Sequence, residues 1–173
     1  MTGIGPTLAR SSPGAGCLQR LKEYFEKAGV AYEVSHHPPR CTAQDLAKVE
    51  HVPGRLVAKV VMVVADGKLV MVVAPATTHV NLAWIREAIR AWDVRLADER
   101  EFAHVFPDCE VGAMPPLGNL YGVPILVDSA LARDPVILFN AGRHDTMITM
   151  TYSDFAQLVR ARTGIVAGVG SPA

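Results

Sequence analysis

Lys59 has the clearest potential for chemistry, because it is a single cation inside an apolar run. The run from Leu56 to Val64 is rich in β-branched residues and predicts a buried strand. A lysine is seldom buried without a partner, and two interpretations stay open. Lys59 either guards the strand entrance with its ammonium group in water, or serves as a cation at the mouth of a pocket that binds an anion such as phosphate.

Two further segments could bind a ligand through their backbone. Gly112–Gly118 contains Pro115 and Pro116 between its glycines, which dictates a fixed, non-repetitive conformation. Backbone groups held at fixed angles can bind a carbonyl oxygen or a ribose hydroxyl without any side chain. With Lys59 and the turn at Gly142-Arg143-His144, this loop forms a candidate constellation. Taken singly, the three parts are also explained as a strand lysine, a tight loop and a hairpin turn.

A metal site and a cysteine nucleophile are weaker alternatives. His36, His37 and Cys41 are close in sequence, but adjacent histidines in an extended segment point to opposite sides and seldom share an ion, so no metal site is predicted. Cys109 precedes the glycine-proline loop, although cysteine is more often a small buried hydrophobic residue. The sequence contains no G-x-S-x-G elbow, Walker loop or dinucleotide fingerprint.

The composition limits the classes of function. The 173 residues suit one domain with a substantial core. Acidic and basic residues balance at 17 each, which argues against a broad electrostatic surface for nucleic acid, so any RNA contact should be small and local. Three cysteines, far apart and odd in number, indicate no disulfide framework and favour a cytoplasmic location. No apolar run is long enough to span a membrane, and no signal pattern is present.

The hydrophobic spacing predicts short strands paired in hairpins, with helices outside the sheet. The expected strands cover 31–34, 57–64, 68–74, 94–96, 124–128, 136–140 and 146–151. The expected helices cover 17–28, 42–51, 82–92, 98–105 and 154–163, and 35–40 is an extended loop. Asp66-Gly67 predicts a hairpin turn, Asn81 and Ser153 are N-cap candidates, and Trp92 completes the inward stripe of its helix. We expect a leader at 1–16, one domain at 17–163 and a flexible tail at 164–173.

Four segments together resemble the YbaK/ProRS-associated editing-domain family, also called the INS superfamily. They are Val57-Ala58-Lys59-Val60-Val61, Gly112-x-x-x-Pro116-Leu117-Gly118, Val127-Asp128 and Phe139-Asn140-Ala141-Gly142-Arg143. The resemblance runs from about Leu18 to Leu158. The Gly-x-x-x-Pro motif is moderately specific by itself, and its combination with the upstream lysine and the downstream Asn-Ala-Gly-Arg segment is much more specific.

The resemblance implies an α+β fold, with a mixed, mostly antiparallel, barrel-like sheet of about seven strands surrounded by helices. It implies a free-standing hydrolase that deacylates mischarged aminoacyl-tRNA, with a small residue such as Ala, Ser or Cys on tRNA for proline. The implied partners are the acceptor end of aminoacyl-tRNA and, as a further candidate, an aminoacyl-tRNA synthetase. Neither a cofactor, DNA nor a membrane is expected.

The implied catalytic residues are Lys59, Gly112 and Pro116. The substrate-binding candidates are Thr42, Leu117, Gly118, Asn140, Gly142, Arg143 and His144. The sequence departs from the family pattern after the lysine, where Val60 replaces a common Thr or Ser, and at Pro115 and His144-Asp145. These departures bear on which amino acid is removed. Two other functions stay open, a non-catalytic module that binds a tRNA end or small ligand, and a Cys-tRNA deacylase in which the substrate thiol attacks its own ester.

Overall fold

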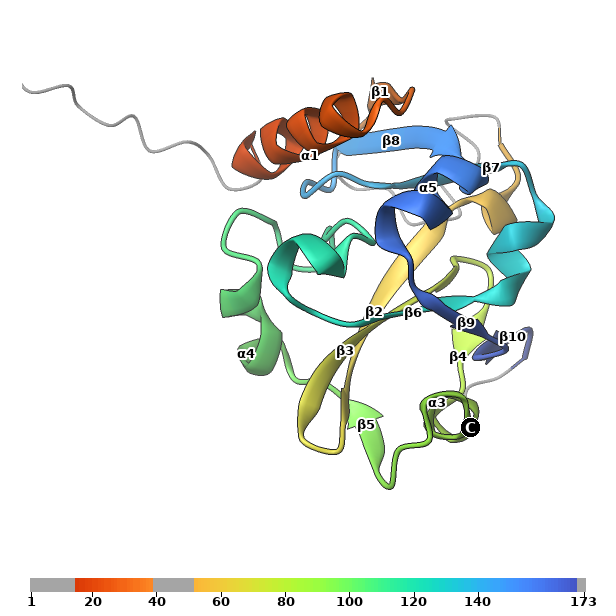
Figure 1. Cartoon of the computed structure of the whole chain (residues 1–173). Helices are drawn as coiled ribbons and strands as arrows, with labels where there is room; N and C mark the ends of the chain where they lie inside the picture. Colours follow the sequence, from red (N-terminus) through yellow and green to blue (C-terminus); the bar gives the residue numbers. More distant parts are fainter. Residues whose placement is uncertain (1–14, 39–51, 171–173) are drawn as a thin grey trace, which may run out of the picture.

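The computed structural model describes residues 15–38 and 52–170 (Figure 1). These ranges contain four α-helices and ten strands. The helices are α1 (Ala15–Ala28), α3 (Leu82–Ile89), α4 (Glu99–Phe102) and α5 (Tyr152–Val159). The strands are β1 (Glu33–His36), β2 (Ala58–Ala65), β3 (Lys68–Pro75), β4 (His79–Val80), β5 (Val94–Leu96), β6 (Ile125–Asp128), β7 (Val136–Asn140), β8 (Thr146–Thr151), β9 (Arg162–Gly164) and β10 (Ala167–Gly168). The predicted helix at 42–51 lies outside the described residues.

The strands form three sheets, in the orders β5-β2-β3-β6-β9, β1-β8-β7 and β10-β4. Antiparallel pairs dominate, while β3 pairs with β6 and β6 with β9 in parallel. The α+β class and the mixed, mostly antiparallel sheet are therefore confirmed. The barrel-like description is not, because the described strands belong to separate sheets and not to one closed barrel.

The hairpin β2–β3 is the central element of the largest sheet. Its eight residue pairs run from Ala58 opposite Pro75 to Ala65 opposite Lys68. The turn places Asp66 and Gly67 at φ of 49° and 80°, the left-handed conformations that an Asp-Gly hairpin turn requires. Both faces of the hairpin are covered, which explains why its strands read as almost continuous valine runs.

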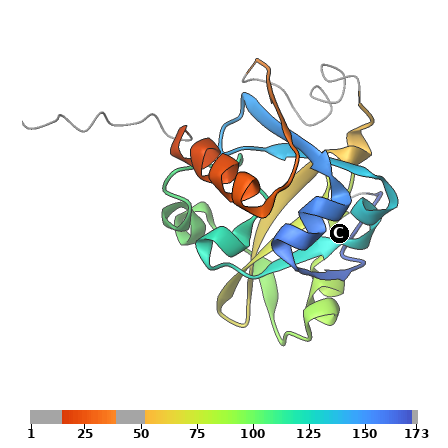
Figure 2. The same cartoon turned by 45° about the horizontal axis from the view of Figure 1, so that its top comes forward.

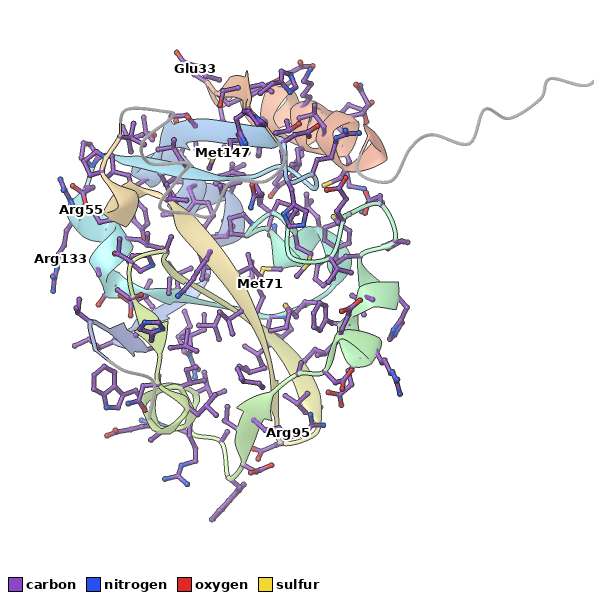
Figure 3. The ribbon with its side chains drawn as sticks, turned by 180° about the vertical axis from the view of Figure 1, so that it is seen from behind. Glu33, Arg55, Met71, Arg95, Arg133 and Met147 are labelled. Carbon is purple, nitrogen blue, oxygen red and sulfur yellow. The ribbon has the colours of Figure 1, made fainter. Side chains whose placement is uncertain are left out.

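The main core lies between the two larger sheets and is closed by α1 and α5 (Figure 2). Phe25, Met71, Phe139 and Phe155 are fully buried there, and Met71 lies near the centre of the molecule in Figure 3. A second cluster, on the opposite face of the five-stranded sheet, includes Val63 and Ile85 of α3. A third, smaller cluster is centred on Val57, Leu138 and Met147.

Two predictions about residues at helix ends are wrong. Helix α3 begins after the expected N-cap, where the Asn81 side chain accepts from the Trp84 N–H, but it ends at Ile89 because Arg90 adopts a left-handed conformation. Trp92 is therefore beyond the helix and 92% exposed, so its assignment to the inward stripe is wrong. Helix α5 is capped by Thr151 and begins at Tyr152, so Ser153 is not its N-cap.

The first strand lies later than predicted. It spans Glu33–His36 and pairs antiparallel with β8 from Glu33 opposite Thr149 to His36 opposite Thr146. Ser35 and His36 are consequently strand residues and not part of the expected loop. Their backbone groups join the ladder, which only the fold can reveal, because the two prolines that follow signal an extended chain in either case.

The chain after residue 163 is part of the folded structure. Strand β9 pairs with β6 and β10 pairs with β4. Asp128, 2% exposed, accepts hydrogen bonds from the N–H groups of Ala130, Val166 and Ala167, each 2.9 Å long. A buried carboxylate needs such donors, so this segment is held in place at least as far as Gly168. None of the helices in the described ranges combines the length and apolarity needed to cross a bilayer.

Candidate functional site

Lys59 is the second residue of β2 and is partly buried. Strand alternation puts its side chain on the same face as Val57 and Val61. Its ammonium group donates to the carbonyl oxygen of Thr78, in the loop after β3. No carboxylate in the described part of the chain pairs with it, and burial lowers the pKa of Lys59 from its ordinary value. The cation therefore keeps donor capacity for an anionic or oxygen-rich ligand.

A bridge just before β2 connects the two larger sheets beside Lys59. Val57 pairs with Leu138 in parallel, so Lys59 and Asn140 each stand two residues beyond a bridged pair and on the face of the small cluster of Val57, Leu138 and Met147. The side-chain oxygen of Asn140 is buried and has no hydrogen-bond partner within 15–38 and 52–170. A buried amide oxygen without a partner is costly, which marks this position as one that a ligand could complete.

The glycine-proline loop is tied to the end of β7 by backbone hydrogen bonds. Gly142 N–H donates to the Ala113 carbonyl at 2.9 Å, and Glu110 N–H donates to the Gly142 carbonyl at 2.8 Å. Gly142 has φ of 86°, and a Cβ there would lie 2.5 Å from Cys17 Sγ. Only glycine fits this position without displacing its neighbours.

The His144 side chain supports the same loop from the turn between β7 and β8. Its Nε2 lies 2.8 Å from the Val111 carbonyl oxygen, and its backbone N–H donates to Glu110 Oε2 at 2.9 Å. Gly112 has φ of 85°, and a Cβ there would lie 3.2 Å from the His144 ring. The loop and the turn, which are distant in sequence, therefore form one unit.

The backbone N–H groups of this loop are candidate hydrogen-bond donors to a ligand. The N–H groups of Gly112 and Met114 find no acceptor in the described part of the chain, whereas Pro115 and Pro116 have no N–H to offer. Both prolines are buried, which fixes the loop. Two free donors on a rigid backbone are the kind of group that can hold a carbonyl oxygen.

Three of the predicted substrate-binding residues have a role in the fold, through an ion pair or through close packing. Arg143 forms a two-bond ion pair with Asp145, with both contacts at 2.9 Å, and this pairing holds the pKa of Asp145 well below its usual range. Leu117 is fully buried in the main core. A Cβ at Gly118 would lie 2.9 Å from the Val123 carbonyl oxygen. Thr42 lies outside the described residues.

Several neighbours of the site were not predicted. Thr78 supplies the oxygen that Lys59 contacts, and Glu110 holds the turn at His144. Ser35 Oγ and His37 Nε2 are buried and, like Asn140, lack a partner in the described ranges; Ser35 pairs with Met147, which in turn pairs with Asn140. The only sequence signals for these positions are the threonine pair at 77–78, after a predicted strand, and the Ser-His-His run at 35–37. Strand pairing across about a hundred residues is what brings them together.

The chain belongs to the aminoacyl-tRNA editing domain family, whose model matches residues 37–158. This range includes Lys59, the glycine-proline loop and the Asn140–His144 segment. The resemblance to the YbaK/ProRS-associated editing-domain family is thereby confirmed.

Individual relatives agree with this assignment. The chain is 26% identical over 136 residues to a proline--tRNA ligase from Leuconostoc citreum (strain KM20), and the match covers 76% of this chain and 23% of the ligase. It thus spans about a quarter of that enzyme. Among solved structures, a candidate trans-editing enzyme for prolyl tRNA synthetase aligns with a TM-score of 0.78 and 16% identity, covering 89% of this chain and 98% of the other. The hypothetical protein APE2540 aligns with a TM-score of 0.78 and 20% identity, covering 86% and 99%. At these identities the structures establish the shared fold.

Proposed function

We propose that the protein is an aminoacyl-tRNA deacylase that hydrolyses the ester between a wrongly attached small amino acid and tRNA. Ala, Ser and Cys are the expected amino acids and tRNA for proline the expected carrier. The enzyme would act in trans on the acceptor end of tRNA, with an aminoacyl-tRNA synthetase as a candidate partner. Family membership and the similarity to a segment of a proline--tRNA ligase support this proposal.

The observation that carries the proposal is the position of Lys59. It is a partly buried cation that shares a face with Asn140, and no carboxylate of the described residues neutralises it. An ammonium group that none of these carboxylates neutralises attracts phosphate as a point charge. Lys59 would therefore bind and orient the phosphate or ribose of the terminal nucleotide and would act neither as a base nor as a nucleophile.

The glycine-proline loop would supply the carbonyl contact. The N–H groups of Gly112 and Met114 are candidates to polarise the aminoacyl carbonyl oxygen and to hold the attacking water beside it. The substrate ester is already activated, so correct positioning provides much of the acceleration. No side-chain nucleophile is required.

Selection would depend on the size of the amino acid side chain. A restricted apolar site excludes a larger amino acid efficiently. It separates amino acids that differ by one methylene by only about 10- to 200-fold. We therefore expect several small amino acids to be removed and the cognate proline to be retained.

A deacylation assay with tRNA for proline charged in turn with Ala, Ser, Cys and Pro tests this function. We expect release of at least one small amino acid and protection of Pro. Release of Cys alone, with Ser-tRNA intact, would replace the proposal with attack by the substrate thiol. Binding of the tRNA end without release of any amino acid would identify a non-catalytic module.

A further inference from the structure

Two cysteines that are far apart in sequence touch in the fold. Cys17, in the first turns of α1, and Cys109, in the segment after α4, have their Sγ atoms 3.4 Å apart. Both are free thiols. Neither the number nor the spacing of the three cysteines indicates this contact, because the number is odd and the spacing matches no recognisable motif.

The environment of the pair is polar on one side. Tyr121 Oη lies 3.4 Å from Cys109 Sγ and 3.5 Å from Cys17 Sγ, and donates to Asp108 Oδ1 at 2.9 Å. The Arg20 guanidinium carbon lies 4.9 Å from the centre of the Tyr121 ring. Cys17 is fully buried, whereas Cys109 is only partly buried. A small oxidant can therefore approach the pair from the Cys109 side.

We propose that Cys17 and Cys109 are a redox modification site that closes to an intramolecular disulfide when the protein meets a peroxide. The two sulfurs need to approach by roughly 1.4 Å to reach the length of an S–S bond. Their neighbours in the chain are held by backbone hydrogen bonds, so the approach is a local adjustment of one helix turn and one loop.

The step balances with hydrogen peroxide as the oxidant. The Cys17 thiolate attacks one peroxide oxygen; the S–O bond forms, the O–O bond breaks, and the departing hydroxide takes up the proton that Cys17 released, leaving as water. Cys109 sulfur then attacks the Cys17 sulfenic sulfur; the S–S bond forms, the S–O bond breaks, and hydroxide leaves with the Cys109 proton as a second water. Two thiols are oxidised and one peroxide is reduced to two waters.

The order of attack follows from the hydrogen bond between the sulfurs. The S–H group of Cys109 donates to Cys17, which lowers the pKa of the Cys17 thiol and raises that of Cys109. Cys17 is thus the sulfur that becomes a thiolate first, and a thiolate is the reactive form. Cys109 is in place to complete the disulfide.

The pair also lies directly against the candidate site. The missing Cβ of Gly142 is the space that Cys17 fills, at 2.5 Å, and Cys109 Sγ would be 3.6 Å from it. Glu110, which follows Cys109, donates its N–H to the Gly142 carbonyl. A shift of either sulfur therefore moves the backbone that holds the glycine-proline loop.

Peptide mapping after oxidation tests the modification directly. The full chain and its Cys41→Ser variant are treated with hydrogen peroxide, alkylated without reduction, digested and analysed by mass spectrometry. We expect a Cys17–Cys109 cross-linked peptide in both proteins, reversed by dithiothreitol. We also expect the melting temperature to rise by about 5–10 °C on oxidation, because the cross-link closes a long loop. Recovery of Cys17 and Cys109 as two alkylated thiols, under treatment that fully oxidises glutathione, would overturn the proposal, as would cross-links to Cys41 alone.

Single variants give the matched controls. In Cys109→Ser, peroxide should leave Cys17 carrying one extra oxygen and no cross-link; in Cys17→Ser, Cys109 should be recovered as a free thiol.

An activity measurement, which rests on the proposed deacylase function, tests whether oxidation of the cysteine pair changes the rate of deacylation. We expect deacylation to fall severalfold on oxidation and to recover on reduction, with no response in Cys17→Ser, which can form neither the disulfide nor an oxidised Cys17. Unchanged deacylation by the cross-linked protein would refute the coupling to the site, while the mapping result judges the disulfide independently.

Discussion

The two ends of the β2–β3 hairpin carry side chains of opposite charge, Asp66 and Lys59, which differ in their hydrogen-bond partners. At the turn, Asp66 accepts hydrogen bonds from the N–H groups of Trp92 and Asp93, with a shortest distance of 2.9 Å to each. At the other end, Lys59 contacts one carbonyl oxygen and no carboxylate of the described residues. The Asp66 carboxylate stabilises the fold through its hydrogen bonds, whereas the Lys59 ammonium group can still donate to a ligand.

This difference separates a structural charge from a functional one within a single element. Asp66 lies on the surface, and its hydrogen bonds fix the path of the chain between α3 and β5. Lys59 is partly buried, and burial without an opposite charge opposes folding, as its lowered pKa records. Such a residue is retained when its role in binding outweighs its cost to stability. Substitution of Lys59 should therefore reduce activity and leave stability nearly unchanged, whereas substitution of Asp66 should reduce stability and leave activity unchanged.

The largest effect is expected for Lys59→Met. Loss of one preorganised cationic contact should lower kcat/KM for deacylation by about a hundredfold or more, with little loss of stability. Lys68→Met is the matched control, because it removes the same charge from the same hairpin at an exposed position. Single-turnover deacylation measures both. Near-normal activity in Lys59→Met would remove the basis of the proposed function.

Gly142→Ala should be the most damaging change for the fold near the site. The new Cβ would meet Cys17 at 2.5 Å in a left-handed conformation, and we expect a loss of about 3 kcal/mol in the free energy of unfolding. Gly122→Ala is the control, because Gly122 also has a positive φ of 71° but has nothing within 4 Å of an added Cβ. Urea denaturation compares them, and equal losses would show that the close contact with Cys17 is unimportant.

Asp66→Ala should lower stability by about 2 kcal/mol, because it removes the hydrogen bonds from the Trp92 and Asp93 N–H groups and puts alanine at φ of 49°. Deacylation should be unchanged at a temperature where the variant is folded. Asp66→Asn keeps an acceptor and tolerates the left-handed conformation, so it should stay within about 0.5 kcal/mol of the parent. A large loss of activity in either variant would contradict a purely structural turn.

The smallest effect is a dependence of stability on pH. Because the pKa of Lys59 is lowered by folding, the unfolded chain binds more protons in the interval between the folded value and the ordinary value of 10.5. The cost of burying the charge is fully present below that interval and is relieved as pH rises through it. The parent should therefore gain stability relative to Lys59→Met on approaching pH 10.5, as measured by denaturation of both proteins across the alkaline range. A constant difference would mean that Lys59 is not desolvated.

The features predicted from sequence are those set by local chemistry. Valine runs joined by Asp-Gly gave the hairpin, Asn81 gave the start of α3, and the combination of motifs gave the family. Lys59 could be singled out because a cation in such a run is unusual. Its position relative to Asn140 could not, since it depends on the pairing of Val57 with Leu138 across the two sheets.

The predictions that failed were extrapolations of a pattern beyond a local break. The apolar stripe of α3 was extended to Trp92, although the left-handed Arg90 ends the helix first. The segment after residue 163 was expected to be flexible from its glycine content, yet two of its N–H groups bind the Asp128 carboxylate. In both cases the backbone conformation or hydrogen bonding of one or two residues decides the outcome, and composition does not report on it.

That carboxylate also bears on how the domain is made. Asp128 lies well before Val166 and Ala167 in the chain, and its buried carboxylate accepts hydrogen bonds from both of their N–H groups. During synthesis the central sheet can therefore assemble early, but its last parallel strand and the cover over Asp128 must wait until these residues have left the ribosome. A nascent chain stalled before these two residues would keep the Asp128 carboxylate facing an unfinished core.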